Sequence, residues 1–137
     1  MKKAICVALA LAAILGASVA TAQIKKGKTR ILTTKQLMGG LVQPHCKALG
    51  DGLKEAPADD DAWAALATHA ALLNETSYLL MDDGRCPDAT WADASKILGE
   101  GSAELYAKIE AKDAEGAQAA FKAMTQSCGT CHKAHKK

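Results

Sequence analysis

The residues with the most recognisable chemistry in this chain lie near its end, in the stretch SCGTCH from Ser127 to His132. Cys128 and Cys131 are three positions apart, so on a helix both thiols lie on one face, and His132 follows directly. Two thiols at this spacing can each add to a vinyl group of one porphyrin, and the adjacent imidazole can reach the iron. The pattern Cys-x-x-Cys-His therefore predicts covalent attachment of one haem c.

Three other interpretations of the motif compete with haem attachment. A thioredoxin-like redox pair is expected near a βαβ pattern, and the chain has no convincing alternating run of β-branched residues. A structural zinc site needs two further ligands at suitable spacing, and none pairs obviously with this motif. A chance match of five residues is the third alternative. The secretory leader, the helical context and the position of the motif favour haem.

The chain begins MKKAICVALALAAILGASVATAQ, in which two lysines precede an apolar run over residues 4–15 and then small residues. This pattern predicts a secretory signal peptide over residues 1–22 and a periplasmic mature protein that starts near Gln23. A retained anchor helix is disfavoured because the apolar run is too short to span a bilayer. We find no later segment apolar enough to span one, so no membrane span is expected in the mature chain.

Residues 23–137 have the length of one compact domain. The leader contains two of the 17 basic residues and none of the 15 acidic ones, so the mature chain is formally neutral. This balance implies neither a nucleic-acid partner nor a polybasic membrane surface. The leader removes Cys6, and the cysteines that remain are Cys46, Cys86, Cys128 and Cys131. In an oxidising compartment each needs a partner or a ligand.

Helical periodicity recurs four times, over residues 34–53, 59–81, from about 87 and from about 113, separated by proline, glycine and aspartate clusters. Such helices with short connections pack most simply as an all-α, antiparallel up-down four-helix bundle. In that arrangement the end of the fourth helix lies beside the start of the first and the turn between the second and third. Trp63, Trp91, Phe121 and Met124 are expected in the core, and Gly99 and Gly101 are expected to bend the third helix.

The first helix is the weakest of the four. Gly39, Gly40 and Pro44 lie inside it; glycine costs about 1 kcal/mol relative to alanine and an interior proline about 3 kcal/mol. Something besides helix propensity must therefore stabilise this segment. The two glycines either let a haem approach the backbone closely or mark a late helix start.

Three stretches resemble one known family: AAFKAMTQSCGTCHKAHKK at the end, LMGG followed by LKEAPADD, and CPDATWADA. The mature chain resembles the class II cytochromes c, which comprise cytochrome c′ and its methionine-ligated low-spin relatives. The resemblance implies that Cys128 and Cys131 carry thioethers, that His132 is the proximal iron ligand, and that the first helix covers the distal face. It also implies a non-enzymatic electron carrier with redox partner proteins, and a homodimer through the first two helices.

The distal residue of this family lies at a characteristic distance before a loop proline, and counting back from Pro57 gives Met38. Methionine at this position ligates the iron in the low-spin relatives, whereas cytochrome c′ has an apolar residue and an open site for nitric oxide or carbon monoxide. Met38 therefore favours a single-electron carrier, with the gas-binding protein as the alternative. A haem-free helical interaction module is a third hypothesis. Met38 could also be a plain core residue.

His45 and Met81 are rival distal ligands. His45 shares a face with Met38 but lies seven residues, or roughly 10 Å, further along the helix, so only one of the two can sit over the iron. Bis-histidine ligation by His45 stays open, because imidazole is a normal axial ligand. His69 and His135 have polar or small neighbours and are expected to be solvated.

The chain departs from the resembled family at Cys46 and Cys86, and at His135 and Lys136, where an aromatic residue and an arginine are common. Cys46 and Cys86 are left over once the haem takes its two thiols. Cys46 is midway along the first helix and Cys86 lies between the second and third, so a disulfide would close a long loop, which is typically worth about 2 to 4 kcal/mol. We predict this disulfide, with two buried, unpaired thiols as the alternative.

Overall fold

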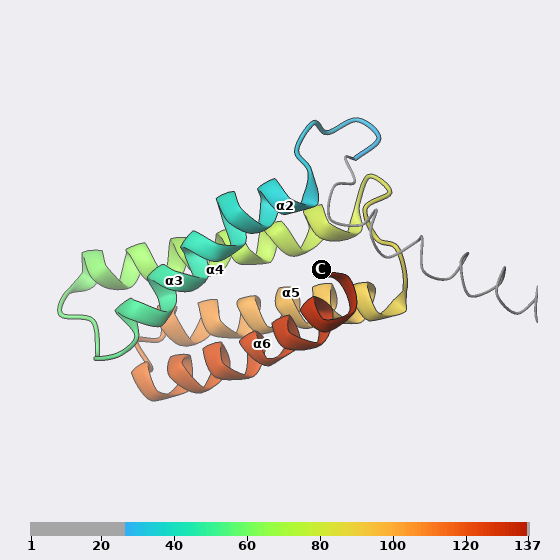
Figure 1. The fold of residues 1–137 in the computed structure, drawn as a ribbon. Helices are drawn as coiled ribbons and strands as arrows, with labels where there is room; N and C mark the ends of the chain where they lie inside the picture. Colours follow the sequence, from blue (N-terminus) through green and yellow to red (C-terminus); the bar gives the residue numbers. More distant parts are fainter. Residues whose placement is uncertain (1–26, 137) are drawn as a thin grey trace, which may run out of the picture.

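The computed structural model describes residues 27–136, so the predicted signal peptide lies outside the described residues. Figure 1 shows the all-α bundle, in which consecutive helices pack side by side. The elements are α2 (Thr34–Leu37), the π-helical turn η1 (Met38–Val42), α3 (Gln43–Gly52), α4 (Asp60–Met81), α5 (Ala89–Glu110) and α6 (Ala114–His135). The first three are continuous and are together named helix one. The predicted all-α four-helix fold is confirmed.

Local capping residues set the start of each helix. Thr33 and Gln36 form a capping box at helix one, in which the Thr33 side chain accepts from the Gln36 N–H and the Gln36 side chain accepts from the Thr33 N–H. Asp59, Asp88 and Asp113 each accept a backbone N–H three residues further on, at 2.8 to 3.0 Å. These side chains satisfy amides that a helix leaves without an internal partner. The helices therefore begin close to the predicted positions.

The π turn η1 explains how helix one continues through its glycines and proline. The Gln43 N–H donates to the Met38 carbonyl, five residues back. Pro44 has no N–H to give, and in a regular helix its ring would clash with the carbonyl four residues before it. The π turn makes Pro44 one of the first residues of α3, where no donor is required. What the sequence shows as a weak point is thus a change of hydrogen-bond register.

Two residues of the α4–α5 connection, Asp83 and Arg85, bind the segment before helix one. Asp83, at φ 60°, accepts hydrogen bonds from the Thr29 and Arg30 N–H groups, each at 2.9 Å. Arg85 is only 1% exposed and donates from Nη1 to the Leu32 carbonyl at 2.6 Å. These contacts hold the segment before helix one against the turn between α4 and α5, as the antiparallel arrangement predicts.

The end of α6 reaches the same end of the bundle. His135 Nε2 lies 3.4 Å from the Asp88 carboxylate, and its ring lies edge-on to Trp91 with centroids 5.3 Å apart. His135 is therefore buried against the start of α5, and the prediction that it is solvated is wrong. The residues that bury His135 belong to another helix, so the sequence around His135 alone could not predict its burial.

The core lies between α4, α5 and α6, and helix one contributes Leu37 and Leu49 to it. Trp63, Trp91 and Met124 are buried as predicted, whereas Phe121 is only half-buried at the edge. Gly99 and Gly101 do not interrupt α5; instead they permit close helix packing. A Cβ at Gly99 would lie 2.6 Å from Ser77 Oγ of α4. At Gly101 it would lie 2.8 Å from the Met124 Cβ of α6.

The predicted disulfide between Cys46 and Cys86 is wrong, because both thiols are free. Cys46 lies beside His45, which contacts His69 near the middle of α4. Cys86 lies beyond Met81, and the twelve residues from His69 to Met81 span about 18 Å. A disulfide needs Cα atoms within about 4.4 to 6.8 Å. The Cys86 thiol instead donates to the Asp88 carbonyl at 3.4 Å.

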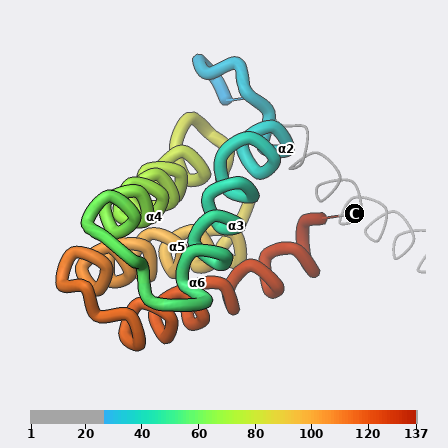
Figure 2. Tube along the Cα trace, turned by 90° about the vertical axis from the view of Figure 1, so that its left-hand side faces the viewer, coloured from blue at the N-terminus to red at the C-terminus, as the bar shows by residue number. Residues whose placement is uncertain are grey.

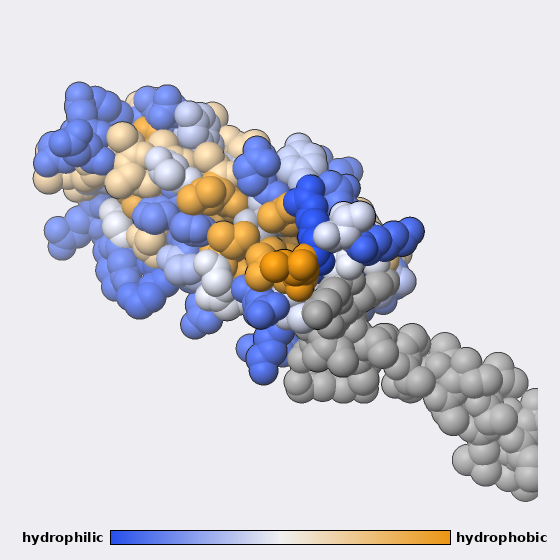
Figure 3. Space-filling view, turned by 90° about the horizontal axis from the view of Figure 1, so that it is seen from above, coloured by the Kyte–Doolittle hydropathy of each residue, from blue (hydrophilic) through white to orange (hydrophobic). Residues whose placement is uncertain are grey.

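The face seen in Figure 3 is mostly hydrophilic, and exposed apolar side chains also lie on α4 and α5, among them Tyr78 and Ile97. Figure 3, viewed from above Figure 1, shows apolar side chains gathered beside the end where the described chain begins. The most exposed large apolar side chain is Ile31, at 82%, and the neighbouring Leu32 is 42% exposed. Within residues 27–136, no helix is both long and apolar enough to cross a membrane.

The packing of α5 against α6 predicts the effect of a methyl group at Gly101. Gly101→Ala should destabilise the protein by about 1 to 2 kcal/mol, because an overpacked core costs more than the alanine gains in helix propensity. The added Cβ meets not only the Met124 side chain but also its Cα, at 3.2 Å, so rotation of the side chain alone cannot relieve the clash.

Urea unfolding of Gly101→Ala measures this loss. Gly40→Ala is the matched control, since a Cβ there meets no other atom within 4 Å, and it should leave stability unchanged or slightly higher. Equal stability of the two variants would contradict the packing described for α5 and α6.

Candidate functional site

A cavity of about 740 Å³ lies between helix one and α6. This volume is within the range of about 300 to 1,000 Å³ typical of small-molecule and cofactor sites. Figure 2 shows helix one approaching α6 at the α3 end and standing away from it at the α2 end. The cavity occupies this opening, and its lining residues include Met38, Gly39, Val42 and Cys46 from helix one, Trp91 from α5, and Thr125, Cys128, Cys131 and His132 from α6.

The closed end of the opening sets the register of the two helices. The Gln118 side chain of α6 donates to the Leu53 carbonyl at 2.6 Å, and a Cβ on Gly50 would lie 3.4 Å from the Phe121 ring. In an antiparallel pair, a step back along one helix matches a step forward along the other. Eleven residues back from Gly50 and eleven forward from Phe121 bring Gly39 level with His132.

Met38 is therefore at the level of His132, on the opposite wall of the same cavity. The two candidate axial ligands are brought together by geometry that is independent of the family register. His45 lies nearer the level of Gln126, about one and a half turns away from His132 on α6. The structure thus favours Met38 over His45 as the residue that faces His132.

The other rival ligands point elsewhere. His45 does not line the cavity; its Nδ1 lies 2.9 Å from Nδ1 of His69 on α4. Met81 does not line the cavity either and is 39% exposed at the end of α4. Met124 is buried, with its sulfur accepting from Ser102 Oγ at 3.2 Å. The spacing of seven predicted that His45 shares a face with Met38, but the extra residue of η1 between them turns His45 toward α4 and away from the cavity, so that prediction is wrong.

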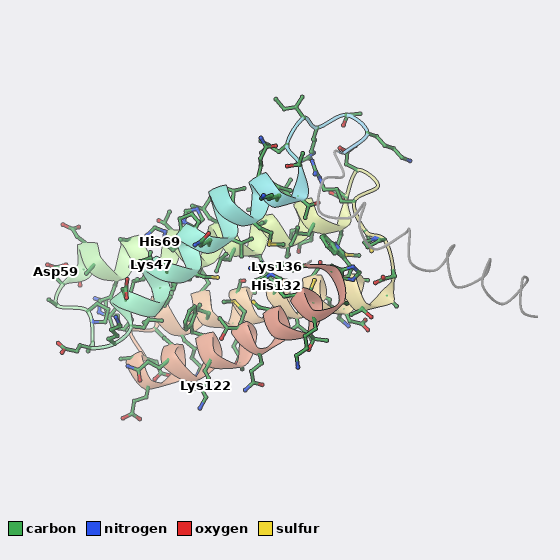
Figure 4. All side chains as sticks on the ribbon, in the orientation of Figure 1. Lys47, Asp59, His69, Lys122, His132 and Lys136 are labelled. Atoms are coloured by element: carbon green, nitrogen blue, oxygen red, sulfur yellow. The ribbon has the colours of Figure 1, made fainter. Side chains whose placement is uncertain are left out.

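The protonation state of His132 suits a metal ligand. Partial burial and the nearby Lys136 ammonium hold the pKa of His132 below its usual value, so the imidazole is neutral at neutral pH. A neutral imidazole nitrogen is the form that binds a metal. Figure 4 shows His132 and Lys136 together at the end of α6. Lys35 also lines the cavity, so two cations border it.

The two motif thiols lie on the cavity side of α6 and are half-buried. Burial raises the pKa of both, and the charges of Cys128 and Asp88 raise that of Cys131 further. Both are protonated at neutral pH, and each can supply an S–H group to a cofactor in the cavity.

Cys46 is a third thiol in the cavity wall, and sequence reasoning missed this position. Burial, and secondarily the neighbouring Cys128, raise the pKa of Cys46 to about 11. Its spacing of four from Val42 and eight from Met38 was the available signal, because positions four apart share a helix face. Trp91 was expected only in the core, yet it also lines the cavity.

The cavity residues fit a covalently bound haem. Cys128, Cys131 and His132 lie on one wall and the thioether of Met38 lies level with His132 on the other. Gly39 lies beside Met38 on helix one, and a Cβ added there would meet nothing within 4 Å, so a flat group can approach the backbone. Among residues 27–136, no cluster of three or more His, Cys, Asp or Glu side chains could hold a metal ion by itself, so a structural zinc site gains no support.

Comparisons with protein-family models, with curated proteins and with solved structures gave no match to this chain. The resemblance to the class II cytochromes c therefore stands on the quoted residues, and the site geometry is the independent argument beside it.

The burial of Cys46 predicts slow reaction with alkylating reagents. Only the thiolate reacts, and at pH 8, three units below a pKa of about 11, roughly one molecule in a thousand carries it. The rate of Cys46 modification by iodoacetamide should rise about tenfold for each pH unit between 8 and 10. Peptide mapping of the native protein, without reduction, measures this rate.

Urea-unfolded protein is the control for this measurement, and there the rate for Cys46 at pH 8 should rise to that of an ordinary thiol. A peptide that links Cys46 to Cys86 in the unreduced protein would contradict the arrangement, as would rapid modification of Cys46 in the native state.

Proposed function

We propose that this chain is a periplasmic monohaem c-type cytochrome of class II that carries single electrons and is not an enzyme. The observation that supports this most strongly is the cavity in which the Cys-x-x-Cys-His motif of α6 faces Met38 of helix one at the level of His132. A haem-free interaction module would not require two thiols and an imidazole on one wall of a cavity of this size.

In this proposal Cys128 and Cys131 would hold haem c through thioether bonds, and His132 and Met38 would bind its iron. Each thiol would add its S–H across one vinyl double bond of the haem, so attachment would need no oxidant and release nothing. The haem would supply an iron centre that takes up and gives up one electron. The thioether of Met38 favours the reduced state and so raises the reduction potential relative to a second imidazole.

The chain's own contribution is to hold both ligands in place during that cycle. α6 is packed along α5, and helix one is tied at its start by Asp83 and Arg85 and at its end by the contact of Leu53 with Gln118. A ligand set that moves little between the two states keeps the reorganisation that accompanies electron transfer small. Lys35 and Lys136 can neutralise carboxylates of a haem in the cavity.

An electron carrier acts on redox partner proteins rather than on a substrate. The exposed Ile31 and Leu32 lie at the cavity end of the molecule, where a partner would have to approach. The predicted leader supports a periplasmic location. Homodimerisation through helix one and α4 is an expectation drawn from the resemblance alone.

The second candidate function is a cytochrome c′-like protein that binds nitric oxide or carbon monoxide. A smaller cavity of about 50 Å³ is lined by Met38 and Val42 together with core residues that include Leu80 and Leu98. This space is larger than one water needs, so a diatomic molecule would fit beside Met38. The gas-binding function requires that Met38 covers the iron without binding it.

The first prediction of the proposal concerns the covalent bond. Mass spectrometry of acid-denatured native protein should give the mass of the chain from about Gln23 plus one haem. Cys128→Ser should retain haem through one bond and Cys128→Ser with Cys131→Ser should release it into acid–butanone. Release of haem from the wild type would sink the assignment of the two thioethers.

The second prediction concerns the sixth ligand. Met38→Ala should convert a low-spin haem to high spin, lower the reduction potential and let carbon monoxide bind the reduced protein rapidly. Optical spectra of both oxidation states, with the weak sulfur-to-iron charge-transfer band of the oxidised wild type, measure the change. The fold should be retained, since Met38 lies at the cavity and outside the α4–α6 core.

His45→Ala is the matched control for Met38, seven residues along the same helix, and should leave the low-spin spectrum unchanged. The opposite result, with His45→Ala and not Met38→Ala abolishing the low-spin state, would establish bis-histidine ligation. A wild type that is already high spin would favour the gas-binding function.

A further inference from the structure

A second group of potential ligands lies away from the cavity, where helix one packs against α4. His45 of α3 and His69 of α4 point their Nδ1 atoms at each other, 2.9 Å apart, with ring centroids 5.1 Å apart and ring planes inclined by 36°. Both side chains are half-buried, and neither lines the cavity. Figure 4 shows His69 beside α3, far along the bundle from His132.

Two facing imidazoles can share either a hydrogen bond or a metal ion. When both are neutral, one Nδ1 carries the proton and donates while the other accepts, so an ion would replace this hydrogen bond once the donor ring carries its proton on Nε2 instead. Partial burial, and then the charge of His69, lower the pKa of His45. Neutral imidazole is the form that ligates metals.

The spacing matches two neighbouring ligands of one metal ion. Metal–nitrogen bonds to histidine are about 2.0 to 2.1 Å long, so two nitrogens at right angles about one ion lie about 2.9 Å apart, and at the tetrahedral angle about 3.4 Å. The observed 2.9 Å is the length of an N–H···N hydrogen bond and also equals the right-angle value, so the two Nδ1 atoms are already close enough to share one ion. Square-planar and tetragonal nitrogen sites are typical of Cu²⁺ and Ni²⁺.

We propose that His45 and His69 together bind a divalent ion of the copper–nickel type across α3 and α4. The imidazoles need only rotate about their soft χ2 torsions for both lone pairs to converge on the ion. Water fills the remaining positions, because the described residues place no third His, Cys, Asp or Glu in a cluster with this pair.

The surroundings do not oppose a cation. The residues one turn before and after His45 on its own helix are Leu41 and Leu49, and those around His69 are Ala65 and Leu73, all uncharged. The nearest lysine in sequence, Lys47, forms an ion pair with Asp51 on the exposed side of α3. No charged side chain one turn away competes for the two nitrogens.

The position of the pair gives metal binding a structural consequence. Helix one packs along α4 but meets α6 closely only at its α3 end, so its attachment to α4 decides where its cavity face lies. A metal that bridges the two helices adds a link seven residues from Met38. The unfolded chain cannot provide the same chelate without closing a loop of 24 residues, so the ion stabilises the folded state.

The test is titration of the purified mature protein, in whatever haem state it is isolated, with Ni²⁺, which free thiols do not reduce. Calorimetry should show one Ni²⁺ per chain, and saturating Ni²⁺ should raise the midpoint of thermal unfolding. His45→Gln and His69→Gln should each weaken binding by about 100-fold, because the second ligation is intramolecular. Glutamine keeps a side chain that can hydrogen-bond, so the unfolding midpoint without metal separates loss of binding from loss of fold.

The double variant separates a chelate from two independent histidines. For a chelate, replacing both residues costs little more affinity than replacing either, whereas for separate sites the losses add and the wild type binds two ions. His135→Gln is the control and should keep the wild-type affinity. Wild-type affinity in either His45→Gln or His69→Gln, or an unfolding midpoint that Ni²⁺ does not move, would overturn the proposal whether or not the chain carries haem.

Discussion

The separation of helix one from α6 is the constraint on which the rest of the structure depends. The two helices touch at one end, through the Gln118 amide on the Leu53 carbonyl and the Phe121 ring against Gly50. At the other end, Asp83 and Arg85 hold the start of helix one to the α4–α5 connection and not to α6. A bundle closed along its whole length would fill the cavity with side chains, and neither the motif nor Met38 would have anything to face.

The two walls of the cavity are built differently. α6 packs along its length against α5, aided by the absence of a side chain at Gly101, so the wall with the Cys-x-x-Cys-His motif belongs to the rigid core. The opposite wall belongs to helix one, whose attachments are a few specific hydrogen bonds, the contact with α4 and the His45–His69 pair. Substitutions in the core, including Leu37 and Leu49 of helix one, should therefore affect overall stability, whereas substitutions on the cavity side of helix one should affect the geometry over the motif.

The features that could be predicted from the sequence are those with local causes. Aspartates at 59, 88 and 113 cap helices because each bonds an amide three residues away, and four amphipathic segments with short links leave few ways to pack. The features that could not be predicted depend on distances between helices, which the sequence does not contain. The prediction of a Cys46–Cys86 disulfide is wrong because the two residues lie far apart along the bundle axis, and the burial of His135 depends on Asp88 and Trp91 from α5.

The π turn at Met38–Val42 also determines where helix one could lose a residue. It contains one residue more than a regular turn would use, so deleting a single residue from it would leave a regular helix whose two halves keep about the same faces. The same deletion in α3, which is regular α-helix, would rotate everything before it by about 100° around the axis. That rotation would carry the thioether of Met38 off the wall that faces His132. The position of the distal residue therefore constrains the length of α3, whereas the π turn tolerates the loss of one residue.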